Sequence, residues 1–298
     1  MCFRLVEAEK AEHRVSRLCK VLGVSRQGYY AWRRREPSRR QLADGQLAGV
    51  IEQVFVDSRR TYGAPRVHAE LREAHRLRVG RKRVARLMRR AGIVGVSRRG
   101  KRRRVQPASG PAAPPAPDLV RRRFKADRPD QLWLADITYV PTWEGWLFLA
   151  VVMDVYSRRI VGWSMREDLS SELVVDALGM AVARRRPNGQ VIHHSDRGSQ
   201  YASLAFGRTL RESGLAASMG SKGDPYDNAM CESVVSTIKQ ELLSRQSWKT
   251  RDDARLALFS YIETFYNPRR RHSALDYLSP DEYEKIRKRE HLEHAVVC

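Results

Sequence analysis

The sequence of 298 residues has room for about two domains, and with 42% hydrophobic residues it has enough apolar side chains to bury a core. It contains no run of 18 apolar residues, and charged residues follow Met1 within a few positions. These features exclude a membrane span and a secretory signal, and they predict a cytoplasmic protein. The four cysteines form no CxxC pair, so neither a disulfide framework nor a zinc site is indicated.

The positive charge is concentrated in the N-terminal part of the chain. Residues 1–125 carry 33 Lys and Arg against 10 Asp and Glu, whereas residues 126–298 carry 23 against 24. The whole net charge of +22 therefore arises from the first segment. Such a basic field attracts a polyanion and releases counterions when it binds. A solubilising basic tail is the alternative, but the asymmetry favours nucleic-acid binding.

Residues 1–36 are predicted to form two short helices. Apolar residues at helical spacing end at Gly23, which can stop a helix, and Ser25 can cap the next helix. A helix, a glycine turn and a second helix are compatible with a helix-turn-helix. An ordinary helical hairpin, with its aromatic residues in the core, explains the pattern equally well.

Residues 37–104 are predicted to form a basic helical DNA-binding domain. Its last predicted helix buries one face, formed by Val84, Leu87, Met88 and Ala91. The other faces carry six basic residues that we expect to bind DNA: Arg81, Lys82, Arg83, Arg86, Arg89 and Arg90. A basic helix after a glycine turn suits a DNA groove, whereas a solvated basic face would contact phosphates alone.

A proline- and alanine-rich stretch divides the chain. We predict a linker at residues 105–125, because such a segment is extended and cannot pack a core. A second domain at residues 126–290 follows it, and residues 291–298 form a tail. Three apolar strands, beginning with Leu132–Val140 and Trp146–Tyr156, precede a helix, a short strand and further helices. Short connections imply antiparallel pairing of the first three strands, so the order indicates a mixed α/β domain.

Carboxylates in this second domain are candidates for chemistry. Burying an unpaired carboxylate is costly, so Asp136, inside the first strand, needs a partner such as an arginine, or a metal ion. Asp154, near the end of the second strand, is a rival with the same status. Asp196 follows a short strand, at the kind of strand end where α/β proteins place their chemistry. His193 and His194 could indicate a His/Asp metal site, but successive residues of a strand point to opposite faces.

Glu232 lies near the start of a predicted helix. Apolar residues that include Cys231 and Ile238 form the buried stripe of this helix, and Glu232 shares a neighbouring face with Asn228 and Lys239. A carboxylate beside a buried stripe can face a cleft at the edge of the sheet. The alternative is an exposed glutamate that interacts favourably with the helix dipole.

Together these residues resemble the D,D(35)E pattern of the retroviral-integrase superfamily, since 35 residues lie between Asp196 and Glu232. The sequence is most similar to the OrfB transposases of the insertion-sequence three (IS-three) family. The stretches that carry the resemblance lie in the same order and cover most of the chain: Arg60–Gly63 with Pro65–Arg66, Trp133–Tyr139, Val152–Trp163, His194–Tyr201, Asp227–Ser233 with Lys239, Tyr266–Asn267, Arg269–Leu275 and Leu278–Pro280.

This resemblance implies a fold and a reaction. The fold would be α/β, an RNase H-like catalytic domain with a mixed five-stranded sheet, preceded by an all-α, helix-turn-helix-like DNA-binding region. The resemblance implies Asp136, Asp196 and Glu232 as catalytic, metal-binding residues, and it leaves Asp154 outside the triad. Two Mg²⁺ ions, or Mn²⁺ as a substitute, would support DNA cleavage and strand transfer during transposition of an insertion sequence, in the bacterial nucleoid.

The resemblance also implies DNA contacts and partners. Lys239 would contact a DNA phosphate near the reacting bond, and Asn228 would orient DNA or a metal ligand. The DNA would comprise the element's terminal inverted repeats and a target, and joining two ends implies a homo-oligomer. The family's active enzyme is usually a frameshift fusion of OrfA to OrfB. This chain lacks a leading heptad zipper, so an OrfA fusion or partner is expected. A DNA-binding regulator with an inactive catalytic fold, and a nuclease that never joins strands, are the rival functions.

Overall fold

The structure is a computed structural model that describes residues 2–97, 116–120, 123–196, 198–220 and 229–297. It divides into two compact units, Met1–Gln53 and Val54–Cys298, which we describe separately. The division falls within α4 (Arg39–Asp57), whereas the sequence suggested one after residue 36. The predicted linker lies largely outside the described residues. No helix in the described part of the chain has both the length and the hydropathy that a bilayer span requires.

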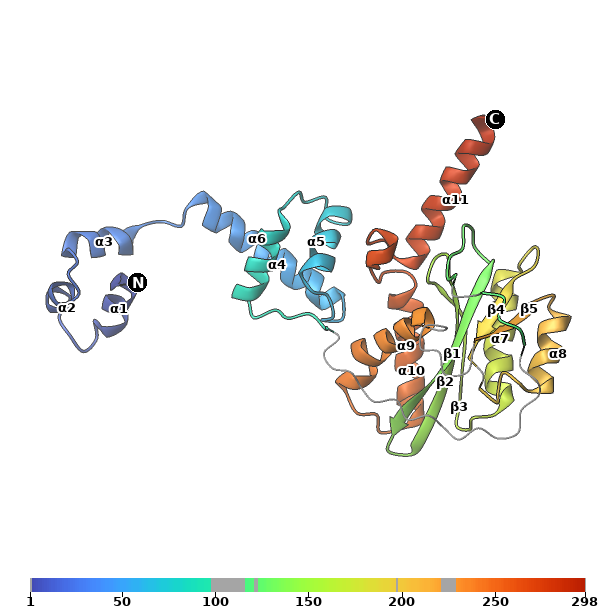
Figure 1. Cartoon of the computed structure of the whole chain (residues 1–298). Helices are drawn as coiled ribbons and strands as arrows, with labels where there is room; N and C mark the ends of the chain where they lie inside the picture. Colours follow the sequence, from blue (N-terminus) through green and yellow to red (C-terminus); the bar gives the residue numbers. More distant parts are fainter. Residues whose placement is uncertain (1, 98–115, 121–122, 197, 221–228, 298) are drawn as a thin grey trace. The chain divides into compact units, whose positions relative to one another are not determined.

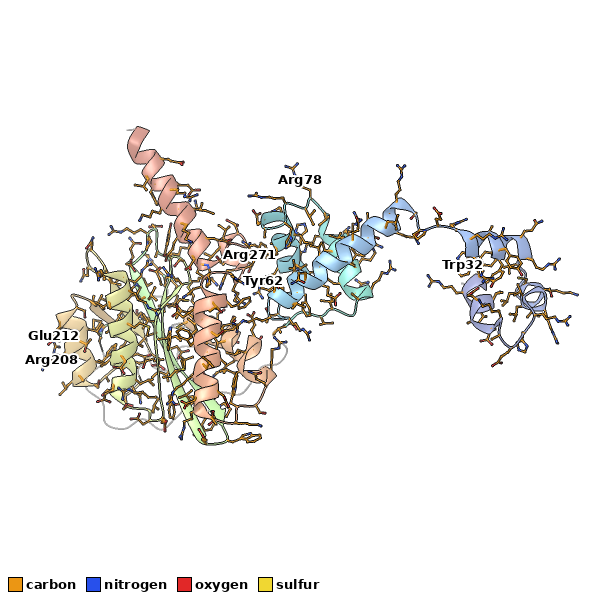
Figure 2. The ribbon with its side chains drawn as sticks, turned by 180° about the vertical axis from the view of Figure 1, so that it is seen from behind. Trp32, Tyr62, Arg78, Arg208, Glu212 and Arg271 are labelled. Atoms are coloured by element: carbon orange, nitrogen blue, oxygen red, sulfur yellow. The ribbon has the colours of Figure 1, made fainter. Side chains whose placement is uncertain are left out.

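The first unit contains three short helices before α4, where the sequence pattern predicted two: α1 (Cys2–Glu9), α2 (Val15–Val21) and α3 (Arg26–Arg34). The helix α1 was missed because its apolar stripe is too short to stand out. Gly23 has a φ of +65°, and Ser25 caps α3 through a backbone hydrogen bond of 3.0 Å, as predicted. The buried core takes one residue from each helix: Val6, Cys19 and Tyr29. Trp32, labelled in Figure 2, stacks on Tyr29, so aromatic residues do pack this core.

The second unit begins with the last residues of α4, followed by α5 (Ala64–Glu73) and α6 (Arg81–Arg90), which pack on one another. Val84, Leu87 and Met88 of α6 are buried, as their spacing predicted. Ala91 was expected on the same face but is exposed, because the helix ends before it and Ala91 serves as the C-cap.

A mixed five-stranded sheet organises the rest of this unit, which confirms the predicted fold class. Its strands are β1 (Leu132–Thr142), β2 (Gly145–Asp154), β3 (Ile160–Arg166), β4 (Ile192–Ser195) and β5 (Ala216–Met219). Their order is β3-β2-β1-β4-β5. The first three strands are antiparallel, whereas β4 runs parallel to both β1 and β5. The sheet therefore has one meander half and one parallel half, and β1 lies between them.

Helices cover both faces of this sheet (Figure 1). One face is covered by α7 (Ser171–Arg185) and α8 (Leu204–Glu212). Packing between α7 and β3 is close, because a Cβ on Gly162 would lie 2.1 Å from the Ala177 carbonyl oxygen. The other face meets the C-terminal elements, which are α9 (Ala229–Glu241), the 3-10 helix η1 (Leu243–Arg245), α10 (Arg251–Ser260) and the π-helix η2 (Tyr261–Tyr266). A 3-10 helix, η3 (Ser273–Leu275), leads to α11 (Pro280–Val297), which continues through most of the tail expected at residues 291–298.

Candidate active site

Asp136 lies on β1, and Asp196 directly follows the neighbouring strand β4. The parallel register of β1 and β4 pairs Leu134 with His194. Asp136 lies two residues after Leu134 on β1, and Asp196 lies two residues after His194, directly beyond the end of β4. Neighbouring strands lie about 4.8 Å apart, and residues two apart along a strand point to the same face. The two predicted carboxylates therefore lie just beyond the paired segments of β1 and β4, near the C-terminal end of β4.

Local hydrogen bonds orient both carboxylates. Asp136 is half-buried, and its Oδ1 accepts a hydrogen bond of 2.9 Å from the Ile137 N–H. Asp196 is exposed, and its Oδ1 accepts one of 3.0 Å from the Gly198 N–H. The first carboxylate is thus held by the sheet, whereas the second lies in a turn at the solvent boundary.

The electrostatics of buried neighbours place the two carboxylates in one environment. Burial raises the pKa of the Tyr201 hydroxyl well above its usual value, and the charges of Asp196 and Asp136 add to this effect. The pKa of the Cys231 thiol is also raised well above its usual value, by burial and by the same two carboxylates. Because Cys231 immediately precedes Glu232, the first turn of α9 lies within the electrostatic reach of both aspartates.

Glu232 is half-buried in that first turn. The helix α9 packs against β1, and Cys231, Val235 and Ile238 are buried, as the spacing predicted. Lys239 lies seven residues after Glu232 and therefore on the same face of the helix. Within the described ranges, no three His, Cys, Asp or Glu side chains are grouped closely enough to hold a metal ion. The structure thus pairs the two aspartates and brings α9 beside them without completing a metal-binding set.

The rival Asp154 has a structural role. Its side chain is fully buried and accepts hydrogen bonds from the N–H groups of Asp130 at 2.7 Å and Tyr156 at 2.8 Å. The guanidinium of Arg185 lies 3.7 Å away. Burial raises the pKa of Asp154 to about 7, against the opposing influence of the Asp130 N–H and of Arg185. A carboxylate supplied with donors in this way fastens the turn after β2.

The two histidines beside Asp196 contact different parts of the fold. The ring of His193 packs against Phe206 at 5.2 Å, in the core beneath α8, and burial lowers the pKa of His193 to about 4. Nδ1 of His194 lies 2.9 Å from the Ser218 hydroxyl. Both side chains are buried. Their separate surroundings do not support the alternative of a His/Asp metal site.

The predicted DNA-contacting residues are only partly placed. Lys239 is half-buried on α9, and Asn228 lies outside the described residues. On α6 the basic side chains differ in exposure: Arg81, Lys82, Arg89 and Arg90 are exposed, whereas Arg83 and Arg86 are half-buried. Because one face of α6 is buried and these basic residues lie on its other faces, α6 presents a basic surface.

The sequence interpretation missed a buried ion-pair cluster at the other end of α9. Glu241 is 5% exposed and forms a two-pronged pair with Arg270, which is 3% exposed. Arg66 of α5 contacts the same carboxylate. Arg66 and Arg270 both lie in stretches that carry the family resemblance, so their presence in motifs was the available signal, but no sequence pattern pairs either of them with Glu241.

Protein-family models match three stretches of this chain. Residues 126–225 match a family model described as an integrase core domain, and residues 213–280 match a second model with the same description. Residues 41–102 match an HTH-like domain. The integrase core matches include Asp136, Asp196 and Glu232, and the HTH-like match includes α5 and α6.

Curated relatives match nearly the whole chain. The transposase for insertion sequence element IS629 of Shigella sonnei is 41% identical over 94% of this chain and 95% of its own length. Transposase InsF for insertion sequence IS3A of Escherichia coli K12 is 40% identical over 95% of this chain and 98% of its own. Among solved structures, the HTLV-2 integrase catalytic core domain in complex with magnesium is 16% identical, with a TM-score of 0.41 over 54% of this chain and 99% of that chain. That last likeness is too low to add to the argument. The full-length relatives and the integrase core matches show that this chain belongs to the insertion-sequence three (IS3) family of transposases.

Proposed function

We propose that this chain catalyses metal-dependent cleavage of DNA and transfer of the cut strand, with Asp136, Asp196 and Glu232 as its catalytic carboxylates. The observation that supports this most directly is the parallel pairing of β1 with β4 as far as Leu134 and His194, because Asp136 and Asp196 each follow two residues later. Carboxylate oxygens from two neighbouring segments offer a divalent cation the ligands that it prefers. The two aspartates therefore favour a metal site over a purely structural role.

The chemistry of these side chains suits magnesium. Mg²⁺ prefers oxygen ligands and binds proteins through one or two carboxylates together with water and substrate phosphate. We infer two ions, with Mn²⁺ as a substitute, which when bound would stabilise the attacking and leaving oxygens of an in-line displacement. Asp136 and Asp196 would supply two of the metal ligands, and Glu232 of α9 would supply the third.

The remaining roles belong to residues around this edge of the sheet. The strand β1 fixes Asp136, so one ligand is pre-positioned before DNA arrives. Lys239, on the same face of α9 as Glu232, would contact a phosphate near the reacting bond, and Asn228 would orient DNA or a ligand. The nucleophile would be water in the cleavage step and a DNA 3′-hydroxyl in the joining step.

DNA binding would come from the basic N-terminal part of the chain. The basic residues of α6 would contact the terminal inverted repeats of the element, with Arg81, Lys82, Arg89 and Arg90 most accessible. Catalysis on two ends and a target requires more than one active site, so we propose a homo-oligomer. An OrfA fusion or partner would supply a further DNA-binding module.

The test compares wild type with Glu232→Gln on DNA that carries the element's own ends, with Mg²⁺ present. Glu212→Gln is the matched control, because Glu212 lies on α8 and forms an exposed ion pair with Arg208 (Figure 2). We expect Glu232→Gln to lose cleavage and joining by at least about 100-fold while DNA affinity persists. We expect Glu212→Gln to match wild type.

Each result has a definite meaning. Undiminished activity in Glu232→Gln would remove this residue from the site. Cutting without joining by the wild type, in assembled complexes, would favour a nuclease. If wild-type protein binds the ends but never cuts them, even with OrfA supplied, the regulatory function is favoured instead.

A further inference from the structure

Two sequence stretches that lie about two hundred residues apart meet within the second unit. The hydroxyl of Tyr62 donates a hydrogen bond of 3.1 Å to the Arg269 carbonyl oxygen and accepts one of 2.7 Å from the Arg271 N–H. Figure 2 labels Tyr62 and Arg271, which lie close together there. The Arg271 guanidinium contacts Glu70 of α5 at 2.6 Å and Glu282 of α11 at 2.7 Å. The HTH-like segment is therefore fastened to the end of the integrase core.

Arg59 makes a second attachment between the same segments. Its Nη2 donates hydrogen bonds to the Ser260 hydroxyl at 2.8 Å and to the Thr264 hydroxyl at 3.2 Å. Its guanidinium also lies over the Phe265 ring, 5.5 Å from the centroid. In return, Arg245 donates a hydrogen bond of 2.6 Å to the Arg59 carbonyl oxygen. The attachment thus reaches the π-helix η2 and the segment directly after α9.

We call this set of contacts between the HTH-like segment and the end of the integrase core the joint. Its centre is the Glu241 carboxylate, in the last turn of α9. Arg270 donates to Oε2 from Nε at 2.8 Å and to Oε1 from Nη2 at 2.6 Å. Tyr261 donates to Oε2 at 2.7 Å, and Arg66 donates to Oε1 at 3.2 Å. These four bonds use about all the acceptor positions that a carboxylate has. Although burial opposes it, the hydrogen bond from Arg270 and the charges of Arg270 and Arg66 hold the pKa of Glu241 below its usual value.

Stability alone does not account for Arg66 at this position. Glu241 and Arg270 already neutralise each other in a two-pronged pair whose side chains are each 4% exposed. A second guanidinium must lose solvent and approach another cation, and both burial and Arg270 lower the pKa of Arg66. Adding a charge to a complete buried pair brings little net stabilisation. What Arg66 does provide is a direct polar link from α5 to α9.

The helix α9 contains both Glu241, which Arg66 contacts, and Glu232 of the candidate active site. Glu241 and Glu232 lie nine residues apart on it, a separation of about 14 Å along the helix axis. The apolar stripe of α9 holds the helix on β1, but such packing is not directional and permits small shifts along the axis. A charged two-pronged contact does fix direction and position. The placement of Glu232 therefore depends on how firmly the far end of its helix is held.

We propose that Arg66 is a positioning residue, which fixes α9 through Glu241 and thereby sets where Glu232 lies relative to Asp136 and Asp196. The HTH-like segment would then act on the active site as well as on DNA, because α5, which contains Arg66, packs on the basic helix α6. This inference rests on the proposed catalytic role of Glu232.

The test uses three substitutions on the same helix in the full chain. Arg66→Met keeps the alkyl stem but removes the link to Glu241, and Arg66→Lys restores a cation. Arg72→Met is the matched control, because Arg72 forms its ion pair with Glu73, next to it on α5. Two readouts are independent of catalysis: hydrogen exchange of the α9 amides, and Mn²⁺ binding followed by electron paramagnetic resonance. Cleavage is measured alongside as a function of Mn²⁺ concentration.

We expect Arg66→Met to speed α9 amide exchange and to raise the half-saturating Mn²⁺ concentration about tenfold, with a smaller change in the rate at saturating metal. Arg66→Lys should recover part of both effects, and Arg72→Met should match wild type. If Arg66→Met matches Arg72→Met in exchange and in Mn²⁺ binding, the positioning role is overturned. It is also overturned if both Arg66 variants unfold, since Arg66 would then hold the fold itself.

A parallel Glu232→Gln variant separates this proposal from the proposed function. If Glu232→Gln keeps its activity and its Mn²⁺ binding, the catalytic assignment fails, and the active-site part of the joint proposal fails with it. If Glu232→Gln is inactive while Arg66→Met behaves as wild type, the catalytic assignment stands and the joint alone is wrong.

Discussion

Asp136 and Asp154 lie in adjacent antiparallel strands, three residue pairs apart, and they show two different fates of a carboxylate in an apolar strand. Asp136 pairs with Val151 in the β1–β2 register, and Trp133 pairs with Asp154. Asp154 is completely buried, with backbone N–H groups and Arg185 around it. Asp136 is half-buried, and a second carboxylate, Asp196, lies just beyond the end of the neighbouring strand β4.

The difference shows that the surroundings of a carboxylate separate structural from chemical roles better than its place in a strand does. At Asp154 the protein supplies the donors, so the group contributes to the fold. Near Asp136 the protein places a second carboxylate, Asp196, and the charges of both raise the pKa values of Tyr201 and Cys231. Two such carboxylates offer the oxygen ligands that a divalent cation prefers.

The largest effect on activity is expected from a substitution of Asp136 on β1. Asp136→Asn removes one negative ligand, so we expect strand transfer to fall by at least about 100-fold. The unfolding free energy without metal should change by less than about 1 kcal/mol, because the Asn side-chain oxygen can still accept the hydrogen bond from the Ile137 N–H. Urea unfolding with and without Mg²⁺ measures this: the ion should stabilise wild type but not the variant. Equal stabilisation of both proteins by Mg²⁺ would place the ion elsewhere.

The opposite outcome is expected at the turn after β2. Asp154→Asn leaves buried N–H donors and the Arg185 cation with a poorer acceptor, so we expect a loss of about 2–4 kcal/mol in unfolding free energy. At a temperature where the variant remains folded, its strand-transfer rate should stay close to that of wild type. A variant that folds as well as wild type yet is inactive would reverse the roles of the two aspartates.

The sequence was sufficient to predict the parts of the fold that repeat a pattern. Long apolar strands such as β1 and β2 and the buried stripe of α9 follow directly from residue spacing. The strand β5 is only four residues long, with the sequence Ala-Ala-Ser-Met, so no alternation distinguishes it from a loop. The helix α1 was missed for a similar reason, since its stripe is too short for a period to emerge.

For the candidate site, the sequence predicted residue types but not their pairing. Spacing along β1 could mark both Asp136 and Asp154 as unusual, but only the surroundings of each carboxylate separate them. The cluster around Glu241 was beyond sequence reasoning, because its arginines come from α5 and from the segment after η2. Long-range ion pairs have no period in the sequence, so they must be seen in three dimensions.

A buried histidine on β4, His193, makes the stability of the fold depend on pH. Burial holds the pKa of His193 at about 4, so the folded protein keeps this ring neutral where an unfolded chain, with an ordinary value of 6.5, takes up a proton. Stability from this group is therefore complete above pH 6.5 and is lost as the pH falls toward 4. At pH 5 the loss should be about 2 kcal/mol relative to pH 7.5. Comparing His193→Phe with wild type in urea at both pH values isolates this contribution.

The pH dependence of stability in two histidine variants tests this effect of His193. The stability difference between wild type and His193→Phe should shift in favour of the variant by that amount between pH 7.5 and pH 5. The exposed His13 is the control, and His13→Gln should show the same pH dependence as wild type. A variant whose pH dependence parallels wild type would mean that His193 is not kept neutral by burial.

The smallest effect is expected on the basic helix α6, where charge serves affinity rather than chemistry. Removing one phosphate contact with Arg89→Gln should reduce the slope of log affinity against log salt concentration by about 1, with cleavage at saturating protein unchanged. Asp136→Asn should do the reverse, abolishing cleavage without changing the slope. Arg208→Gln on α8 is the control, because its partner Glu212 already balances that charge at 2.7 Å. If Arg89→Gln left the slope at its wild-type value, DNA would not follow this face of α6, and the excess positive charge of the N-terminal part would have to act through other residues.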